Sequence, residues 1–191
     1  DFKSQELSVA QVFSDHIAHT NCKQVIYLGG IVNDDDLSQH LDSRKSVEDT
    51  LCTSGKPVTV LRAGIVIGSG SASFEIIRDL AEKLPVMVAP KWITTRCQPI
   101  AIKNIIDYLQ GVLFNEKTYS QTFDIGGSDI LTYKEMLLKF AKIRKLKRWI
   151  LVVPVLSPRL SSLWLHFVTS TSYYLARNLV DSMKNEVIAQ P

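Results

Sequence analysis

Two side chains whose types could act together in chemistry lie one helical turn apart in the segment QHLDSRKSVEDTL, at residues 39–51. They are His40 and Arg44. Residues four apart on a helix share a face, so both side chains can reach one cleft. Histidine is the commonest general acid or base near neutral pH, and arginine holds hydroxyl or phosphate groups with a rigid, permanently charged fork.

The alternative for this pair is a solvated helix surface, because the surrounding sequence is highly charged. The charged neighbours are Asp34, Asp35, Asp36, Asp42, Lys45, Glu48 and Asp49. From the spacing alone, the solvated surface is the favoured interpretation.

A second candidate site is the glycine-rich segment IVIGSGSASFEIIRDL at residues 65–80. Gly68 and Gly70 permit a sharp turn, and either Ser71 or Ser73 could cap the helix that follows. Free backbone N–H groups at a helix start attract phosphate or carboxylate. A plain strand-to-helix connection has the same appearance, however, and the chain contains neither a P-loop nor a full dinucleotide fingerprint.

Strand-like and helix-like segments alternate along the chain, and these segments must position the candidate residues. Strands are expected at 23–30, 57–71 (running into a loop), 85–90, 97–102, 121–127 and 148–155, and helices at 7–20, 37–55, 73–84, 103–114, 132–145 and 171–187. The pair Thr132 and Glu135 has capping-box spacing. This order predicts an α/β fold with a largely parallel sheet and helices on both faces, whose ligands bind beyond the carboxyl ends of the strands.

Composition restricts the partners. The chain has 191 residues, of which 46% are hydrophobic, and a formal net charge of +3, which suits one domain or a large part of one and gives no reason to expect nucleic acid. Three scattered cysteines indicate free thiols in a reducing compartment, so we expect a cytoplasmic protein without a metal site. The apolar window 149–168 contains two prolines, Arg159 and His166, so we expect a strand, a turn and a packed helix there rather than membrane association.

The order of segments resembles the second half of the extended short-chain dehydrogenase/reductases, which include sugar-nucleotide epimerases. KQVIYLGG (23–30) is similar to the strand that ends at the family's catalytic serine, and HLDSR (40–44) falls at its Tyr-x-x-x-Lys pair. PVTVLRAGIVIGSGS (57–71) resembles the strand and loop beside the nicotinamide. The segments at 98–113 and 122–137 resemble those that follow, and 154–187 resembles an atypical subgroup of nucleoside-diphosphate-sugar epimerases.

The resemblance implies a Rossmann-type protein that binds NAD or NADP. Residues 1–148 would be the C-terminal part of the cofactor-binding domain, and residues 149–191 a strand and small helical region packed on it. The N-terminal part of such a domain, with the adenine and pyrophosphate site, is then expected upstream of Asp1, and the full-length protein has room for a further C-terminal domain. The implied substrate is a small molecule of the nucleotide-linked sugar type.

By position, the family's catalytic serine, tyrosine and lysine are replaced by Gly30, His40 and Arg44. His40 would transfer a proton and Arg44 would hold the nicotinamide ribose. The remaining predicted cofactor contacts are Gly29, Gly30, Gly64, Ile65 and Val66.

Other arginines have lesser implied roles. Arg78 and Arg96 would meet a substrate diphosphate or form exposed salt bridges, and Arg62 would be an ion-pair anchor. The alternative to an enzyme is a non-catalytic module that uses the bound cofactor for sensing or for interaction with a partner.

Overall fold

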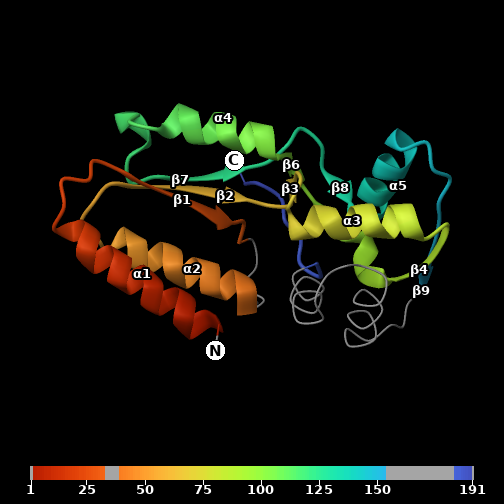
Figure 1. Cartoon of the computed structure of the whole chain (residues 1–191), viewed down its shortest axis with the longest axis horizontal. Helices are drawn as coiled ribbons and strands as arrows, with labels where there is room; N and C mark the ends of the chain where they lie inside the picture. The colour runs from red at the N-terminus through yellow and green to blue at the C-terminus, as the bar shows by residue number, and fades with distance from the viewer. Residues whose placement is uncertain (1, 33–38, 154–182, 191) are drawn as a thin grey trace.

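The computed structural model describes residues 2–32, 39–153 and 183–190, and only the backbone of residues 2, 3, 39 and 40 (Figure 1). Its first lobe is built on a parallel sheet with the strand order β1-β2-β7. The strands are β1 (Val25–Gly30), β2 (Val58–Ala63) and β7 (Thr122–Ile125). β1 and β2 are paired from end to end, so Gly30 lies opposite Ala63 at the carboxyl edge.

Helices cover both faces of this sheet (Figure 1). α1 (Phe2–Ala18) and α2 (Gln39–Cys52) lie on one face, and α4 (Ile102–Val112) lies on the other. β2 is buried on both sides: Val58 and Val60 pack with Leu51 of α2, whereas Leu61 and Ala63 pack with Ile105 of α4. This double burial explains why the β2 sequence is apolar almost throughout rather than alternating.

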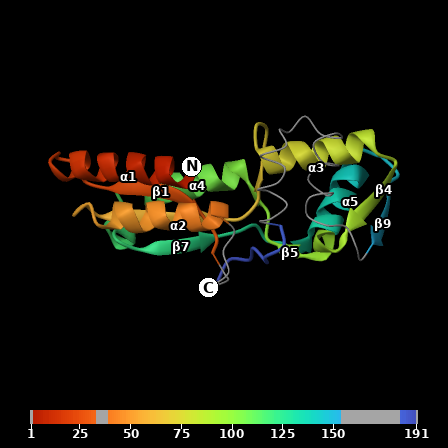
Figure 2. The same cartoon turned by 90° about the horizontal axis from the view of Figure 1, so that it is seen from below.

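The second lobe contains elements from the middle and the later part of the chain (Figure 2). They are α3 (Ala72–Lys83), β4 (Val86–Pro90), η1 (Lys91–Thr94), β5 (Arg96–Cys97), β8 (Leu131–Thr132), α5 (Tyr133–Ile143) and β9 (Trp149–Val153). β4 and β9 pair in parallel, and α3 and α5 share one apolar core with β4. Elements from both sides of residue 148 therefore belong to this lobe.

Several segments of the described chain join the lobes. β3 (Val66–Ile67) follows β2 and pairs in parallel with β6 (Ile100–Ala101), which leads directly into α4. Residues 126–130 lead from β7 to β8. A further connection is the segment 183–190, called here the C-terminal strap. Its residue Val187 forms a bridge with Cys97 in the second lobe, and Gln190 N–H donates to Asp124 Oδ2 in the first lobe at 3.1 Å.

The strap corrects one predicted element. A closing helix was expected over 171–187, of which 171–182 lie outside the described residues. Residues 183–187 are not helical: a turn leads into the extended Val187, whose N–H donates to Arg96 O at 3.2 Å. Its carbonyl accepts the Gln98 N–H at 2.8 Å. Pairing with the β5 backbone thus replaces helical hydrogen bonds.

Two predicted strands are also corrected. The strand expected over 57–71 is two strands, β2 and β3, because the chain changes partner after Ala63 and leaves the sheet for β6. The strand expected over 97–102 is reduced to the ends of β5 and β6, with Gln98 and Pro99 between them. The other predicted elements within the described residues are confirmed with shifted boundaries, and the Thr132–Glu135 capping box is confirmed at the start of α5.

Close backbone packing at Gly127 generates a prediction about stability. A Cβ atom on Gly127 would meet the carbonyl oxygen of Pro99, whereas a Cβ on Gly111 in α4 has no atom within 4 Å. We expect Gly127→Ala to lower the free energy of unfolding by about 1–3 kcal/mol through overpacking. The control Gly111→Ala should raise it by about 0.5–1 kcal/mol, because alanine favours the helix. Urea denaturation measures both, and a neutral Gly127→Ala would contradict the prediction.

Candidate functional site

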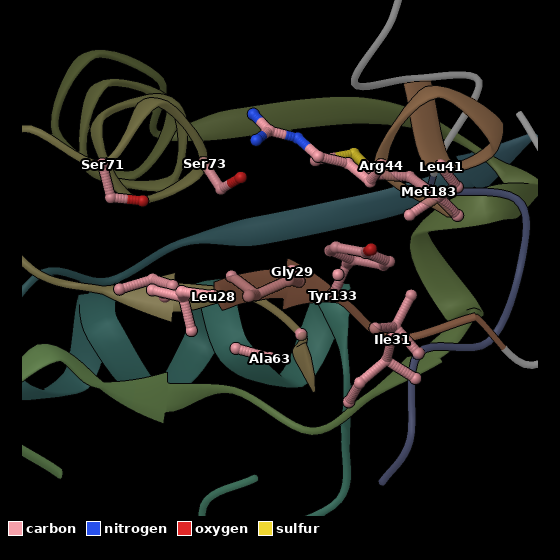
Figure 3. Close-up of a pocket in the computed structure, with 15 residues that line it drawn as sticks. Leu28, Gly29, Ile31, Leu41, Arg44, Ala63, Ser71, Ser73, Tyr133 and Met183 are labelled. Carbon is pink, nitrogen blue, oxygen red and sulfur yellow. The ribbon is translucent and has the colours of Figure 1, made fainter. Parts of the chain in front are cut away.

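A cavity of about 420 Å³ lies where the two lobes meet, at the carboxyl ends of β1 and β2 (Figure 3). The first lobe supplies the residues Leu28 to Ile31, Leu41, Arg44 and the loop Ala63 to Val66. The second lobe and the strap supply Ser71, Ser73, Tyr133, Met183 and Val187. The position agrees with the rule that parallel sheets bind ligands beyond the carboxyl ends of their strands.

Arg44 is the charged side chain of this lining. It projects from α2, is 39% exposed, and lies in Figure 3 with its guanidinium directed away from Leu41 and toward the side of Ser71 and Ser73. Glu6 of α1 is its ion-pair partner, but the 3.7 Å between Arg44 Nη2 and Glu6 Oε1 exceeds a hydrogen-bond distance. The same carboxylate accepts a closer bond of 2.5 Å from Ser43 Oγ. The Tyr27 hydroxyl also takes part in a hydrogen bond with the Arg44 side chain. Because a guanidinium has five N–H donors, Arg44 keeps donors for a ligand beside these contacts.

The orientation of α2 is fixed one turn further along the helix. Arg62 of β2 donates from Nε and Nη2 to the two carboxylate oxygens of Glu48, at 3.0 and 2.5 Å. Glu48 is only 7% exposed and Arg62 21%, and the carboxylate raises the pKa of the guanidinium through this hydrogen bond. Because Glu48 and Arg44 are four residues apart, the bond that turns Glu48 to the sheet also directs Arg44 toward the carboxyl edge.

His40 lies in the first turn of α2, but its side chain is outside the described residues. Its expected position beside Arg44 in the cavity therefore stays a prediction.

The cavity glycines have packing reasons of their own. A Cβ on Gly30 would lie 3.3 Å from Leu41 Cδ2, and a Cβ on Gly64 would lie 3.0 Å from Val187 Cγ1 and 3.2 Å from Gln98 O. A Cβ on Gly29 would lie 3.1 Å from Tyr27 Cε1. These glycines let α2, the strap and the sheet approach one another, and the backbone of all three also lines the cavity.

In the glycine-rich loop before α3, some backbone N–H groups already have hydrogen-bond partners within the protein. Gly70 has φ +83°, which suits glycine, and its N–H donates to Glu75 Oε1 at 3.3 Å. Ser71 is the N-cap of α3 but its side chain makes no capping hydrogen bond. The Glu75 carboxylate thus already accepts a hydrogen bond from one of the N–H groups that were expected to attract phosphate.

The two arginines predicted to contact substrate do not line the cavity. Arg78 on α3 pairs with Glu75 and Asp79, and Arg96 pairs with Glu186 of the strap, with Nε to Oε1 at 2.7 Å. Both arginines form salt bridges, which was the expected alternative to contact with a substrate diphosphate.

Sequence reasoning missed Tyr133, Met183 and Leu41, which also line the cavity. Tyr133 is the first residue of α5, directly after the capping box, and it is 4% exposed. The capping box predicted where α5 begins, but no signal in the sequence indicated that this helix start faces β1 and β2.

Solved structures share this fold, although no protein-family model matches the sequence and a search of the curated proteins finds no match. Triphenylmethane reductase from Citrobacter sp. superposes with a TM-score of 0.74 at 14% identity, over 95% of this chain and 62% of that one. A nucleoside-diphosphate-sugar epimerase from Staphylococcus aureus gives 0.73 at 13% identity, over 95% and 62%. The NADPH-dependent quinone oxidoreductase of Escherichia coli, solved with NADPH, gives 0.72 at 16% identity, over 92% and 59%.

These similarities define the class of fold: a Rossmann-type α/β protein built like the reductases and epimerases above. The fold class predicted from the sequence is confirmed. The chain spans about three fifths of the length of these structures. Within the residues that the structure describes, no helix is both long and apolar enough to cross a membrane.

The packing behind the cavity generates a prediction about cysteine reactivity. Cys97 is fully buried beside the strap, and burial raises the pKa of its thiol to about 12. Partial burial, with Glu48 and Asp49 nearby, also raises the pKa of the Cys52 thiol, but Cys52 is exposed to reagent. Because the thiolate is the reactive form, iodoacetamide at pH 8 should alkylate Cys52 in the folded protein and leave Cys97 unmodified until urea unfolds the chain. Peptide mass mapping measures this, and equal labelling of the two cysteines in native protein would contradict the assigned burial.

Proposed function

We propose that this protein binds NAD or NADP with the nicotinamide riboside in the cavity between the lobes, and that it acts as a reductase or epimerase on a small molecule. The observation that carries the proposal is the convergence of Arg44 with the loop Gly64 to Val66 on one cavity at the carboxyl edge of parallel strands. The similar structures include one solved with NADPH, in the same class of fold.

The described residues fit the nicotinamide riboside half of such a dinucleotide. Leu28, Ile31, Ile65 and Val66 form apolar lining that suits the face of a planar ring. Arg44 supplies a permanent cation with free donors for ribose hydroxyls or a phosphate oxygen. A bound nicotinamide would supply the site of hydride transfer.

The protein residues would then bind, orient and protect. Arg44 holds the ribose side, and the loop after β2 excludes water from one side of the ring. His40 is proposed to hold or deliver the proton that accompanies hydride transfer, in place of the family's tyrosine. Gly30 offers no side-chain donor, so a substrate oxygen must find its hydrogen bond elsewhere in the lining.

The substrate is proposed more coarsely than the cofactor. Three structures of nearly equal similarity are named for a sugar nucleotide, a quinone and a triphenylmethane dye, so this fold accommodates unrelated substrates. A nucleotide-linked sugar stays the substrate proposed from the sequence. Its diphosphate would have to release Arg78 or Arg96 from their present ion pairs.

A non-catalytic role is the second candidate, supported by Gly30 at the position of the catalytic serine. In that case the cofactor would bind in the same cavity, and its binding would regulate an interaction with a partner without any turnover.

Removing the Arg44 cation tests the proposed cofactor site. In the full-length protein, Arg44→Leu should weaken NADPH or NADH binding by about 10- to 100-fold, the effect of losing charge-assisted hydrogen bonds. Titration followed by nicotinamide fluorescence measures it. Arg78→Leu is the matched control, because it removes an arginine outside the cavity and should leave affinity unchanged. Absence of binding to either cofactor in the unmodified protein would overturn the proposal.

A His40→Ala variant separates the two candidates. If His40 transfers a proton, the variant should bind NADPH normally and lose at least about 100-fold in turnover, the usual contribution of a general acid. Consumption of NADPH with a panel of carbonyl substrates measures the rate. Unchanged turnover would contradict the role of His40, and no turnover in the unmodified protein, together with normal cofactor binding, would favour the sensing role.

A further inference from the structure

We infer that Tyr133 is the hydrogen-bond donor that recognises a carbonyl or hydroxyl oxygen of the substrate in the cavity. Its phenol stands among the cavity residues in Figure 3, and it enters from the second lobe, opposite the sheet. The inference deepens the proposed function, and rests on it, by naming the group that selects oxygen-bearing substrates.

The first support is an unpartnered polar group in a buried place. Tyr133 is 4% exposed, and within the described residues the causes that raise the pKa of its phenol are burial and Cys97, with no hydrogen bond among them. The enclosed side-chain atom without a partner in these residues is instead Trp92 Nε1, so the Tyr133 oxygen itself keeps contact with the cavity. Tyrosine hydroxyls usually have a hydrogen-bond partner, and here water or a ligand in the cavity can supply it. A hydroxyl that faces a cavity without a protein partner is available to a ligand.

The second support is rigidity. The capping box of Thr132 and Glu135 fixes the backbone at the start of α5, and Tyr133 N–H donates to Thr95 O at 3.3 Å. The Trp92 ring meets the phenol edge-on, with centroids 6.2 Å apart. The donor is thus held in place before a ligand arrives, which is the condition for selective recognition.

The third support is the kind of hydrogen bond available. Burial raises the pKa of the Tyr133 phenol far above its usual value, so the group stays protonated at physiological pH and can donate. Arg44 carries a fixed charge suited to anionic or polyhydroxylated groups. The neutral phenol suits a carbonyl or hydroxyl oxygen at the opposite wall.

The other hydroxyls of the lining are less suited to this role. Ser71 and Ser73 lie at the start of α3 and are only half-buried, so water can satisfy them. Gly30 lacks a side chain, and the apolar groups of Ile65, Val66 and Met183 can only exclude water. Tyr133 alone among these combines deep burial with a free donor.

Two probes with one carbon skeleton test the inference in the full-length protein. 1-Tetralone has a ketone oxygen and tetralin lacks it, and both are small for a cavity of about 420 Å³. Equilibrium dialysis should show that the unmodified protein prefers 1-tetralone. Tyr133→Phe should reduce that preference by about 2- to 10-fold, the range of one neutral hydrogen bond, and leave tetralin affinity unchanged. Tyr108→Phe, which alters a half-exposed tyrosine on α4, should change neither affinity.

Stability separates recognition from a structural role. Because the hydroxyl has no protein partner, Tyr133→Phe should keep or raise the free energy of unfolding in urea. Equal loss of affinity for both probes, or no preference for 1-tetralone in the unmodified protein, would overturn the inference, as would a destabilised Tyr133→Phe. NADPH titration of the same samples keeps the two proposals apart: absent NADPH binding with intact ketone preference removes the cofactor proposal alone.

Discussion

The bidentate bond between Arg62 and Glu48 determines how the first lobe presents its chemistry. It joins the middle of α2 to the carboxyl half of β2 with two donors and two acceptors, in a place where little water reaches. Removal of either partner would leave a poorly solvated charge, so the bond strongly restricts how α2 can turn about its axis. Arg44 owes its direction to this restriction. The cavity therefore depends on an ion pair that does not itself line it.

Much of the first lobe follows from sequence patterns. The apolar runs predicted β1 and β2, and their burial on both faces agrees with the helices on each side of the sheet. Spacing and resemblance also selected Arg44, Gly29, Gly30 and the loop Gly64 to Val66, which the structure brings to one cavity. These features were accessible because local periodicity determines each element and parallel order determines which strand ends meet.

The second lobe was less predictable because its contacts join distant parts of the chain. β4 pairs with β9 although 58 residues separate the ends of the two strands from Pro90 to Trp149. Val187 pairs beside Cys97, where backbone partners outweigh the helical pattern of its own segment. In the sequence, Tyr133 occupies one of the apolar positions of an amphipathic helix. Only the tertiary position of that helix start, beside the carboxyl ends of β1 and β2, makes Tyr133 a cavity residue.

The two walls of the cavity thus have different chemical characters. The wall from α2 offers a charged group, Arg44, and the wall from α5 offers a neutral donor, Tyr133. A molecule with an anionic or polyhydroxylated end and a carbonyl end would meet both.

The C-terminal strap has a mechanical consequence. It is bonded to the backbone of Arg96 and Gln98 on one side and to the Asp124 carboxylate on the other, and its Val187 rests against Gly64. Any hinge movement that widened the gap between the lobes would stretch this tether or detach it at one end. A ligand that needed a wider gap would therefore have to break strap bonds at Asp124 or at Arg96 and Gln98.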